Sequence, residues 1–156
     1  MNDVLEWVEK AALENLKFHL QTVEVLSKEA NTTLTILIAA LSGAFAFALN
    51  GGRFTAAAWI LTVYLVALCM LLVTQCMMIR EVPAPTNEPR NLNQEGYTLD
   101  ALRRVELRNI QGRIDDVAHR NNITAYRLNC VRVGAILAPL VFTVGAFVVG
   151  AYSRGG

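Results

Sequence analysis

The chain has 156 residues, of which 54% are apolar and 17% are charged, whereas a soluble domain usually carries about 25% charged residues. Residues 30–52, 54–79 and 133–153 contain no charge at all. A bilayer core about 30 Å thick needs about 20 helical residues to cross it, and each of these segments is long enough. Three such helices buried in a soluble protein of this length would leave almost no polar surface. We therefore predict an all-α membrane protein with three transmembrane helices.

The basic residues predict an orientation, because the cytoplasmic flanks of spans are enriched in Lys and Arg. Residues 1–31 and 80–132 carry all but two of the fourteen basic residues and all thirteen acidic ones. The other side would hold only Arg53 and Arg154. We expect a multi-pass protein of the inner (cytoplasmic) membrane with its N-terminus in the cytoplasm and its C-terminus outside. The acidic N-terminal segment does not resemble a secretory signal, so the first span is expected to direct insertion.

Residues 1–31 are predicted to form a cytoplasmic amphipathic helix, because apolar residues recur there at steps of three or four. These residues are Leu5, Val8, Ala12, Leu16, Leu20, Val23 and Leu26. Residues 32–79 are predicted to form a transmembrane hairpin with spans at 32–50 and 54–79. The turn between the spans, Asn50-Gly51-Gly52, is too short for anything but an antiparallel connection.

Residues 80–97 contain three prolines and are predicted to form an extended cytoplasmic loop. Thr98 or Asp100 is expected to cap a cytoplasmic helix over 98–132. Its apolar residues are spaced as in a coiled coil and define a seam of Leu107, Ile110, Ile114, Val117, Asn121, Thr124, Leu128 and Val131. No proline interrupts this segment before Pro139, so the helix is expected to continue into the third span at 133–153. Gly112 is a possible soft point. Pro139 could kink the third span, but we expect its irregularity to be accommodated by packing.

The sequence contains no motif that predicts catalysis. Phosphate-binding glycine loops, HExxH and CxxC are all absent, so we expect no enzymatic activity and no cofactor. His19 and His119 are the only histidines, and no third ligand for a metal is evident. No metal site is therefore predicted. The interiors of the spans also lack any acid or base, which argues against a transporter or proton pump, and leaves open a hydroxyl-lined pore or a lipid-disrupting assembly.

Small residues recur every four positions on two of the predicted spans. They are Ala39, Ala40, Gly43, Ala44 and Ala48 in the first span, and Gly134 and Ala138 in the third. This spacing allows helix backbones to approach closely in lipid. We expect it to serve packing within one chain first; self-association of several chains is the alternative, and the two are compatible. The lipid bilayer and further copies of the chain are the expected partners.

Six arginines along the long helix are the candidate ligand-binding residues, because Arg can hold a phosphate through two hydrogen bonds. They are Arg103, Arg104, Arg108, Arg113, Arg120 and Arg127. The alternative is a solvated helix face that also satisfies the charge rule for cytoplasmic segments. Seven acids in residues 80–132 nearly offset nine arginines, so binding of a nucleic-acid polymer is not expected.

The order of elements, with Ser27-Lys28-Glu29-Ala30 before the first span and Arg120 and Arg127-Leu128 before the third, supports a resemblance. The chain resembles the membrane effectors of bacterial anti-phage signalling, in particular the Pycsar transmembrane effectors and the related SLATT-type proteins. The resemblance implies an antiviral effector. A cyclic nucleotide would bind the cytoplasmic helices, with the six arginines as phosphate contacts. The chains would then oligomerise and disrupt the inner membrane.

Two other functions fit the same pattern. The first is a structural or accessory subunit of a larger membrane complex, which docks a partner through the cytoplasmic helices. The second is a holin-like phage protein. Three-span holins commonly place the N-terminus outside, which is opposite to the orientation that the charges predict.

Overall fold

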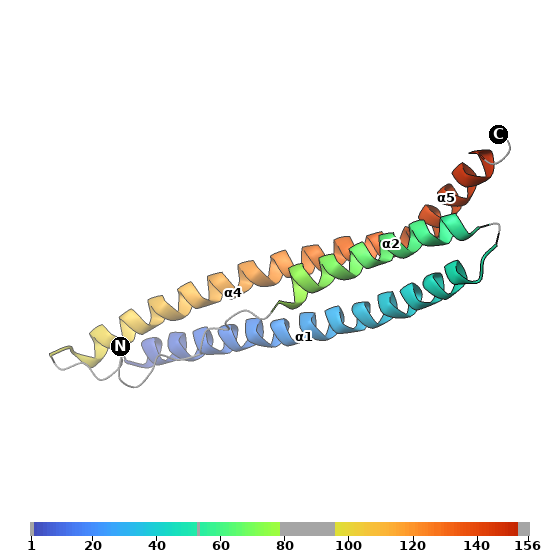
Figure 1. Cartoon of the computed structure of the whole chain (residues 1–156). Coiled ribbons are helices and arrows are strands. Elements are labelled where there is room, and N and C mark those ends of the chain that lie inside the picture. The colour runs from blue at the N-terminus through green and yellow to red at the C-terminus, as the bar shows by residue number, and fades with distance from the viewer. Residues whose placement is uncertain (1, 53, 79–95, 153–156) are drawn as a thin grey trace. The chain divides into compact units, whose positions relative to one another are not determined.

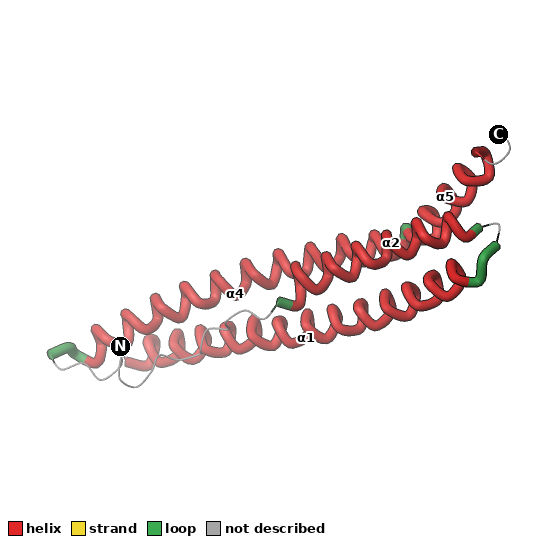
Figure 2. The backbone as a smooth tube through the Cα atoms, viewed as in Figure 1, coloured by secondary structure: helices red, strands yellow, loops and turns green. Residues whose placement is uncertain are grey.

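The computed structural model describes residues 2–52, 54–78 and 96–152, and every regular element in these ranges is helical (Figure 2). Helix α1 runs over Asn2–Leu49, and α2 over Thr55–Leu72 continues directly into a short π-helix, η1, at Val73–Met77. Helix α4 runs over Leu99–Ile136 and α5 over Ala138–Tyr152 (Figure 1). Most of the predicted proline-rich loop lies outside the described residues.

Two helices are long and apolar enough to cross a membrane, one within α1 and one formed by α2 with η1. A third span results if α4 and α5 are counted as one bent pair. The chain divides into two compact units. We call residues 1–26 and 79–123 the polar unit, and residues 27–78 and 124–156 the apolar unit. Helices α1 and α4 each contribute residues to both.

The polar unit is held by an apolar seam between α1 and α4. Leu16, Ile110 and Ile114 form its buried core, and Ala12, Leu13 and Leu20 pack against them. Val117 and Asn121 are also buried, which confirms this part of the seam predicted for residues 107–131. The amide nitrogen of Asn121 donates to the backbone carbonyl of His19 at 2.9 Å. The start of α4 is capped by Thr98, whose hydroxyl oxygen accepts from the amide of Ala101 at 3.4 Å.

In the apolar unit, α1 and α2 are joined by the glycine turn that the sequence predicts. Gly51 has a φ of +62°, a conformation that costs glycine nothing and other residues about 1 kcal/mol or more. The turn is closed by Thr55, whose hydroxyl accepts from the amide of Gly52 at 2.6 Å and donates to the carbonyl of Gly52 at 2.8 Å. The rings of Phe45 and Trp59 meet edge to face at 5.7 Å, so the two helices are neighbours.

A bend of 42° separates α4 from α5. The helix that was predicted to continue into the third span is therefore a bent pair of helices. The break lies at Leu137, whose amide is shared between the carbonyls of Val133 and Gly134 at 3.1 Å each. Pro139 is the cause, because proline has no amide hydrogen to donate and its ring displaces the carbonyl four residues earlier. Gly112, the other suspected point of bending, lies inside uninterrupted helix.

Helix α2 packs closely on α4 and α5 through glycines. A Cβ on Gly134 would lie 2.9 Å from Cδ2 of Leu68, and a Cβ on Gly145 would lie 3.6 Å from the Cα of Ala57. The hydroxyl of Tyr64 donates to the carbonyl of Gly134 at 2.8 Å, in the same region of close approach. These contacts fix α2 against the bent pair.

Candidate functional site

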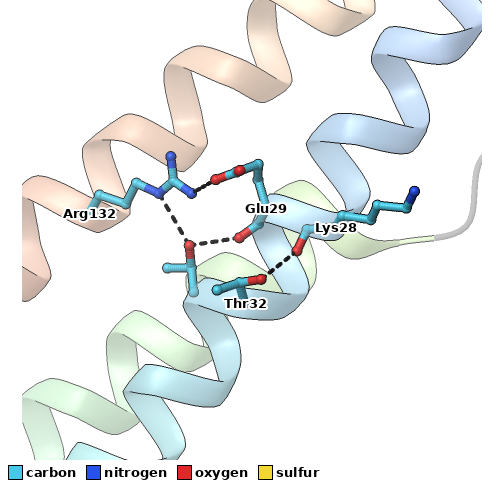
Figure 3. A network of polar contacts seen from close by, with 5 residues as sticks. Lys28, Glu29, Thr32 and Arg132 are labelled. Atoms are coloured by element: carbon cyan, nitrogen blue, oxygen red, sulfur yellow. Dashed lines mark hydrogen bonds and ion pairs between the residues drawn. The ribbon is translucent and has the colours of Figure 1, made fainter.

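Charged and hydroxyl side chains of α1 and α4 form a polar cluster at the edge of the uncharged sequence (Figure 3). The guanidinium of Arg132 donates to the carboxylate of Glu29 and, through Nε, to the hydroxyl of Thr33 at 3.2 Å. Thr33 in turn donates to the backbone carbonyl of Glu29 at 2.8 Å and is buried. The hydroxyl of Thr32 donates to the carbonyl of Lys28 at 3.0 Å.

The position of this cluster in the sequence gives it a boundary role. Glu29 is the last charged residue before the uncharged segment 30–52, and Arg132 is the last before 133–153. Each partner is only partly exposed, with 38% of the Arg132 side chain and 51% of the Glu29 side chain accessible. The pair therefore joins two helices where their uncharged segments begin, and it brings together the opposite charges that immediately precede those two segments.

Beyond this cluster, the apolar unit contains an open groove of about 770 Å³ between α1, α2 and the bent pair. Its lining is almost entirely apolar. The α1 side includes Leu37, Ala40, Gly43, Ala44 and Phe47, the α2 side Ala58, Leu61 and Leu65, and the bent pair Ala135, Ala138, Pro139, Phe142 and Thr143. At one end, the ring of Phe142 lies 6.4 Å from the rings of both Phe47 and Phe54.

The small residues predicted to pack helices fall into two groups. Ala44 and Ala48 are buried, Gly134 is held against Leu68, and Ala138 is half-buried in the groove. Ala39, Ala40 and Gly43 are exposed in the single chain. A Cβ built on Gly43 would meet no atom within 4 Å. One chain therefore uses only part of its small-residue surface.

Five hydroxyl groups of the apolar unit are bonded within their own helices. Thr35, Ser42, Thr62, Thr74 and Thr143 each donate to the carbonyl four residues earlier, at 2.7–3.0 Å. This back-bonding is how hydroxyl side chains are tolerated inside helices. The donors of these hydroxyls are thus already used, so a hydroxyl-lined pore would have to rely on their remaining lone pairs.

The six arginines do not converge on one place in the chain. Arg103 lies 3.7 Å from the carboxylate of Glu9, and Arg113 lies 3.8 Å from that of Glu106. Arg104 and Arg108 are exposed and form no ion pair with the described part of the chain. At 100° per residue, the side of α4 that carries these two lies roughly 150° from the side that carries Arg113 and Arg120. Arg127 belongs to the apolar unit and is half-buried.

No family model, curated protein or solved structure matches this chain. The site is therefore characterised by its own chemistry. Among the described residues, no three His, Cys, Asp or Glu side chains come together in a way that could hold a metal ion. The groups that the structure does bring together are the Arg132 cluster, the apolar groove and the exposed small residues of α1.

Neither the groove nor the Glu29–Arg132 ion pair was predicted from the sequence. Glu29 and Arg132 are separated by 103 positions, and no sequence motif pairs them. Their only sequence signal is that each immediately precedes an uncharged segment. The groove has no sequence signal, because it is a gap between helices and depends on how segments distant in sequence are placed.

Proposed function

We propose that the protein is a membrane-embedded effector that assembles into oligomers and disrupts the integrity of the membrane, with α1, α2 and the bent pair α4–α5 as its three spans. The observation that carries this proposal is the uncovered packing surface of the apolar unit. Ala39, Ala40 and Gly43 lie exposed beside an open groove. In lipid, helices associate through close packing of such residues. A single chain thus leaves unused the kind of surface on which membrane helices associate.

The chemistry of the spans supports disruption over transport. The three uncharged segments contain no acid or base, although transporters and pumps usually keep such a group in the membrane. Five hydroxyls are bonded to their own helices. The spans provide apolar packing surface and no charged groups, so we expect the function to arise from the association of several chains.

The orientation and setting belong to the same proposal. The charge distribution favours a cytoplasmic N-terminus in the inner membrane, and the resemblance to anti-phage effectors supplies a cyclic nucleotide as the trigger. Arg104 and Arg108 are the arginines best suited to receive it, since they are exposed, lie four residues apart and so share one helix face. A phosphate bound by Arg104 and Arg108 would be out of reach of Arg113, so we expect these two arginines to contribute most of the nucleotide binding.

The test is reconstitution of the purified full chain into liposomes that contain a self-quenching dye, with and without added cyclic mononucleotides. Dye release and, in cells, loss of membrane potential are expected. Replacing both Arg104 and Arg108 by Gln should abolish the response to nucleotide, whereas Arg113→Gln, at an arginine paired with Glu106, should preserve it. Intact liposomes and normal growth under all conditions would contradict the effector function.

A second function is favoured by a separate observation on the polar unit. Val4, Trp7, Phe18 and Val25 are exposed on α1, and Val4, Ala11, Phe18 and Val25 recur every seven residues. A contiguous patch of large apolar side chains outside a membrane span marks a candidate protein-binding surface. This stripe favours an accessory subunit that docks a partner helix. Trp7→Ser and Phe18→Ser would then abolish partner binding and leave the liposomes unaffected.

A further inference from the structure

The polar cluster around Arg132 and the apolar groove lie on the same side of α1. The cluster contributes Glu29 and Thr33, and the groove continues from them at steps of three and four. The residues in order are Glu29, Thr33, Ile36, Ala40, Gly43 and Phe47. Residues at these steps share one face of a helix. The cluster is therefore the first turn of the stripe of α1 that lines the groove.

The bent pair α4–α5 shows the same continuity. Arg132, Ala135, Pro139 and Thr143 follow one another at steps of three, four and four, and the last three line the groove. Arg132 precedes Ala135 by about 4.5 Å along the helix axis. In Figure 3 its side chain reaches from α4 toward Glu29 on α1. The ion pair thus lies at one end of the groove and joins the two helices that form its walls.

The groove fits one lipid acyl chain in length and in chemistry. From Ile36 to Phe47, α1 rises about 16 Å at about 1.5 Å per residue, and half of a bilayer core about 30 Å thick is about 15 Å. Among the described residues of the lining, only Thr143 has a polar side chain, and its hydroxyl already donates to the carbonyl of Pro139. A hydrocarbon chain in the groove would therefore leave no hydroxyl donor without a partner.

The end of the groove beside the cluster offers one charge of each sign. A guanidinium has five N–H donors, and the bonds from Arg132 to Glu29 and Thr33 use two of them. Three donors remain for a further acceptor. The bond from Arg132 uses one carboxylate oxygen of Glu29, and 51% of the Glu29 side chain is exposed. The cluster can thus donate to an anion and accept from a cation at the same time.

We propose that the groove binds one phospholipid with a zwitterionic headgroup. Its acyl chain lies along the groove, its phosphate accepts from Arg132, and its ammonium donates to Glu29. Arginine suits a phosphate because several of its N–H groups can donate at once, and basic pockets between membrane helices bind lipid headgroups. An anionic headgroup without an ammonium would face the Glu29 carboxylate with no charge to offset it. The site therefore prefers phosphatidylethanolamine to phosphatidylglycerol.

This inference rests on the proposed placement of the apolar unit in a membrane, and it names the lipid that the unit selects there. Ala40 and Gly43 line the groove and also belong to the surface proposed for assembly. A lipid in the groove would therefore have to leave before copies of the chain pack through these residues.

Native mass spectrometry of the purified full chain in detergent tests the headgroup contacts. Phosphatidylethanolamine and phosphatidylglycerol with identical acyl chains are added in equal amounts. We expect the monomer to retain phosphatidylethanolamine about tenfold more than phosphatidylglycerol. Glu29→Gln should remove most of this preference, and Arg132→Gln should lower the retention of both lipids. The control is Lys28→Gln, which should change neither, because the Lys28 side chain points away from Arg132 in Figure 3.

A second variant tests the acyl chain separately. Gly43→Leu fills the groove from within the chain, and it should still fold because a Cβ there meets no atom within 4 Å. It should lower the retention of both lipids and leave their ratio unchanged. Val63→Leu, at an exposed position of α2 outside the groove lining, is the matched control and should retain both lipids as the unmodified chain does.

Three outcomes would overturn the proposal. Equal retention of the two lipids by the unmodified chain would remove the headgroup contacts. A preference that survives both Glu29→Gln and Arg132→Gln would show lipid bound elsewhere on the spans. Monomers without a preferred lipid, beside dimers that dissociate in Gly43→Leu, would place a second chain in the groove.

The liposome assay separates this inference from the proposed function. Preferential retention of phosphatidylethanolamine without any dye release would retain the lipid site and reject the effector. Dye release by a chain that shows no lipid preference would retain the effector and reject the lipid site.

Discussion

The buried asparagine of the polar unit is a residue whose substitution is expected to stabilise the protein, whereas most substitutions of buried residues destabilise it. Asn121 is 7% exposed within an otherwise apolar seam, and its side-chain nitrogen donates to the carbonyl of His19. His19 lies inside α1, where its carbonyl also receives the amide four residues further along. Replacing Asn121 by an apolar residue therefore leaves no backbone group without a partner.

The magnitude follows from two opposing contributions. The lost hydrogen bond costs about 1 kcal/mol, whereas burying a leucine side chain in the seam contributes about 1.5–3 kcal/mol. Asn121→Leu is thus expected to stabilise the polar unit by about 1 kcal/mol, consistent with the general cost of one polar residue in a coiled-coil seam. Asn121→Ala loses the bond and leaves a hole, and should destabilise the unit by about 1–2 kcal/mol.

Hydrogen exchange of the full chain in lipid nanodiscs measures this directly, because the amides of residues 8–26 and 100–123 report the opening of the polar unit. A gain of about 1 kcal/mol corresponds to roughly fivefold slower exchange. Asn122→Leu, at the exposed neighbouring position, is the control and should leave exchange unchanged. If Asn121→Leu accelerates exchange as much as Asn121→Ala does, the assignment of a dispensable hydrogen bond is wrong.

Three further predictions concern the apolar unit. Gly134→Ile should lower the free energy of unfolding in detergent by about 2 kcal/mol or more, because its Cβ would lie 2.9 Å from a buried leucine of α2. The control is Gly112→Ile, whose side chain meets open space and should cost less than about 1 kcal/mol. Equal losses of stability in the two variants would refute the close approach of α2 to Gly134. A double-mutant cycle with Glu29→Gln and Arg132→Gln should give a coupling of about 1 kcal/mol or less, because both side chains are partly exposed, and the coupling should fall in 1 M salt. Pro139→Ala should reduce the 42° bend by restoring an amide donor, and spin-label distances across the bend should lengthen; unchanged distances would place the cause of the bend in the packing on α2.

The coiled-coil seam and the all-helical architecture could be read from the sequence because both depend on local periodicity. The steps from Ile110 to Ile114, Val117 and Asn121 give one helix face, and all four are buried. The apolar segments could be found because a charge in a membrane span is costly wherever it lies. The position of the bend between α4 and α5 was harder to predict, since Gly112 and Pro139 both disfavour helix. Glycine retains its amide and costs only about 1 kcal/mol, so the helix continues there and breaks beside the proline.

What the sequence could not give is the relation between helices that are distant along the chain. Ala40 and Ala44 are equally spaced small residues, yet Ala44 is buried and Ala40 is exposed. This difference in burial depends on which side of α1 faces α2 and the bent pair. The periodicity of α1 alone does not contain that information. The stripe containing Val4, Phe18 and Val25 did have a signal, a repeat of seven, but the inward-facing repeat on the same helix obscured it.

The distribution of polar bonds indicates where specificity in this molecule is expected to lie. Inside the apolar unit the hydroxyls of Ser42, Thr62 and Thr143 donate to carbonyls of their own helices, so these donors cannot distinguish one neighbouring helix from another. A side-chain bond between elements is made by Tyr64 to Gly134, and an ion pair by Arg132 to Glu29, and both lie within one chain. In the proposed assembly, recognition between copies would then have to come from the shape of the apolar surfaces, of which the open groove is one.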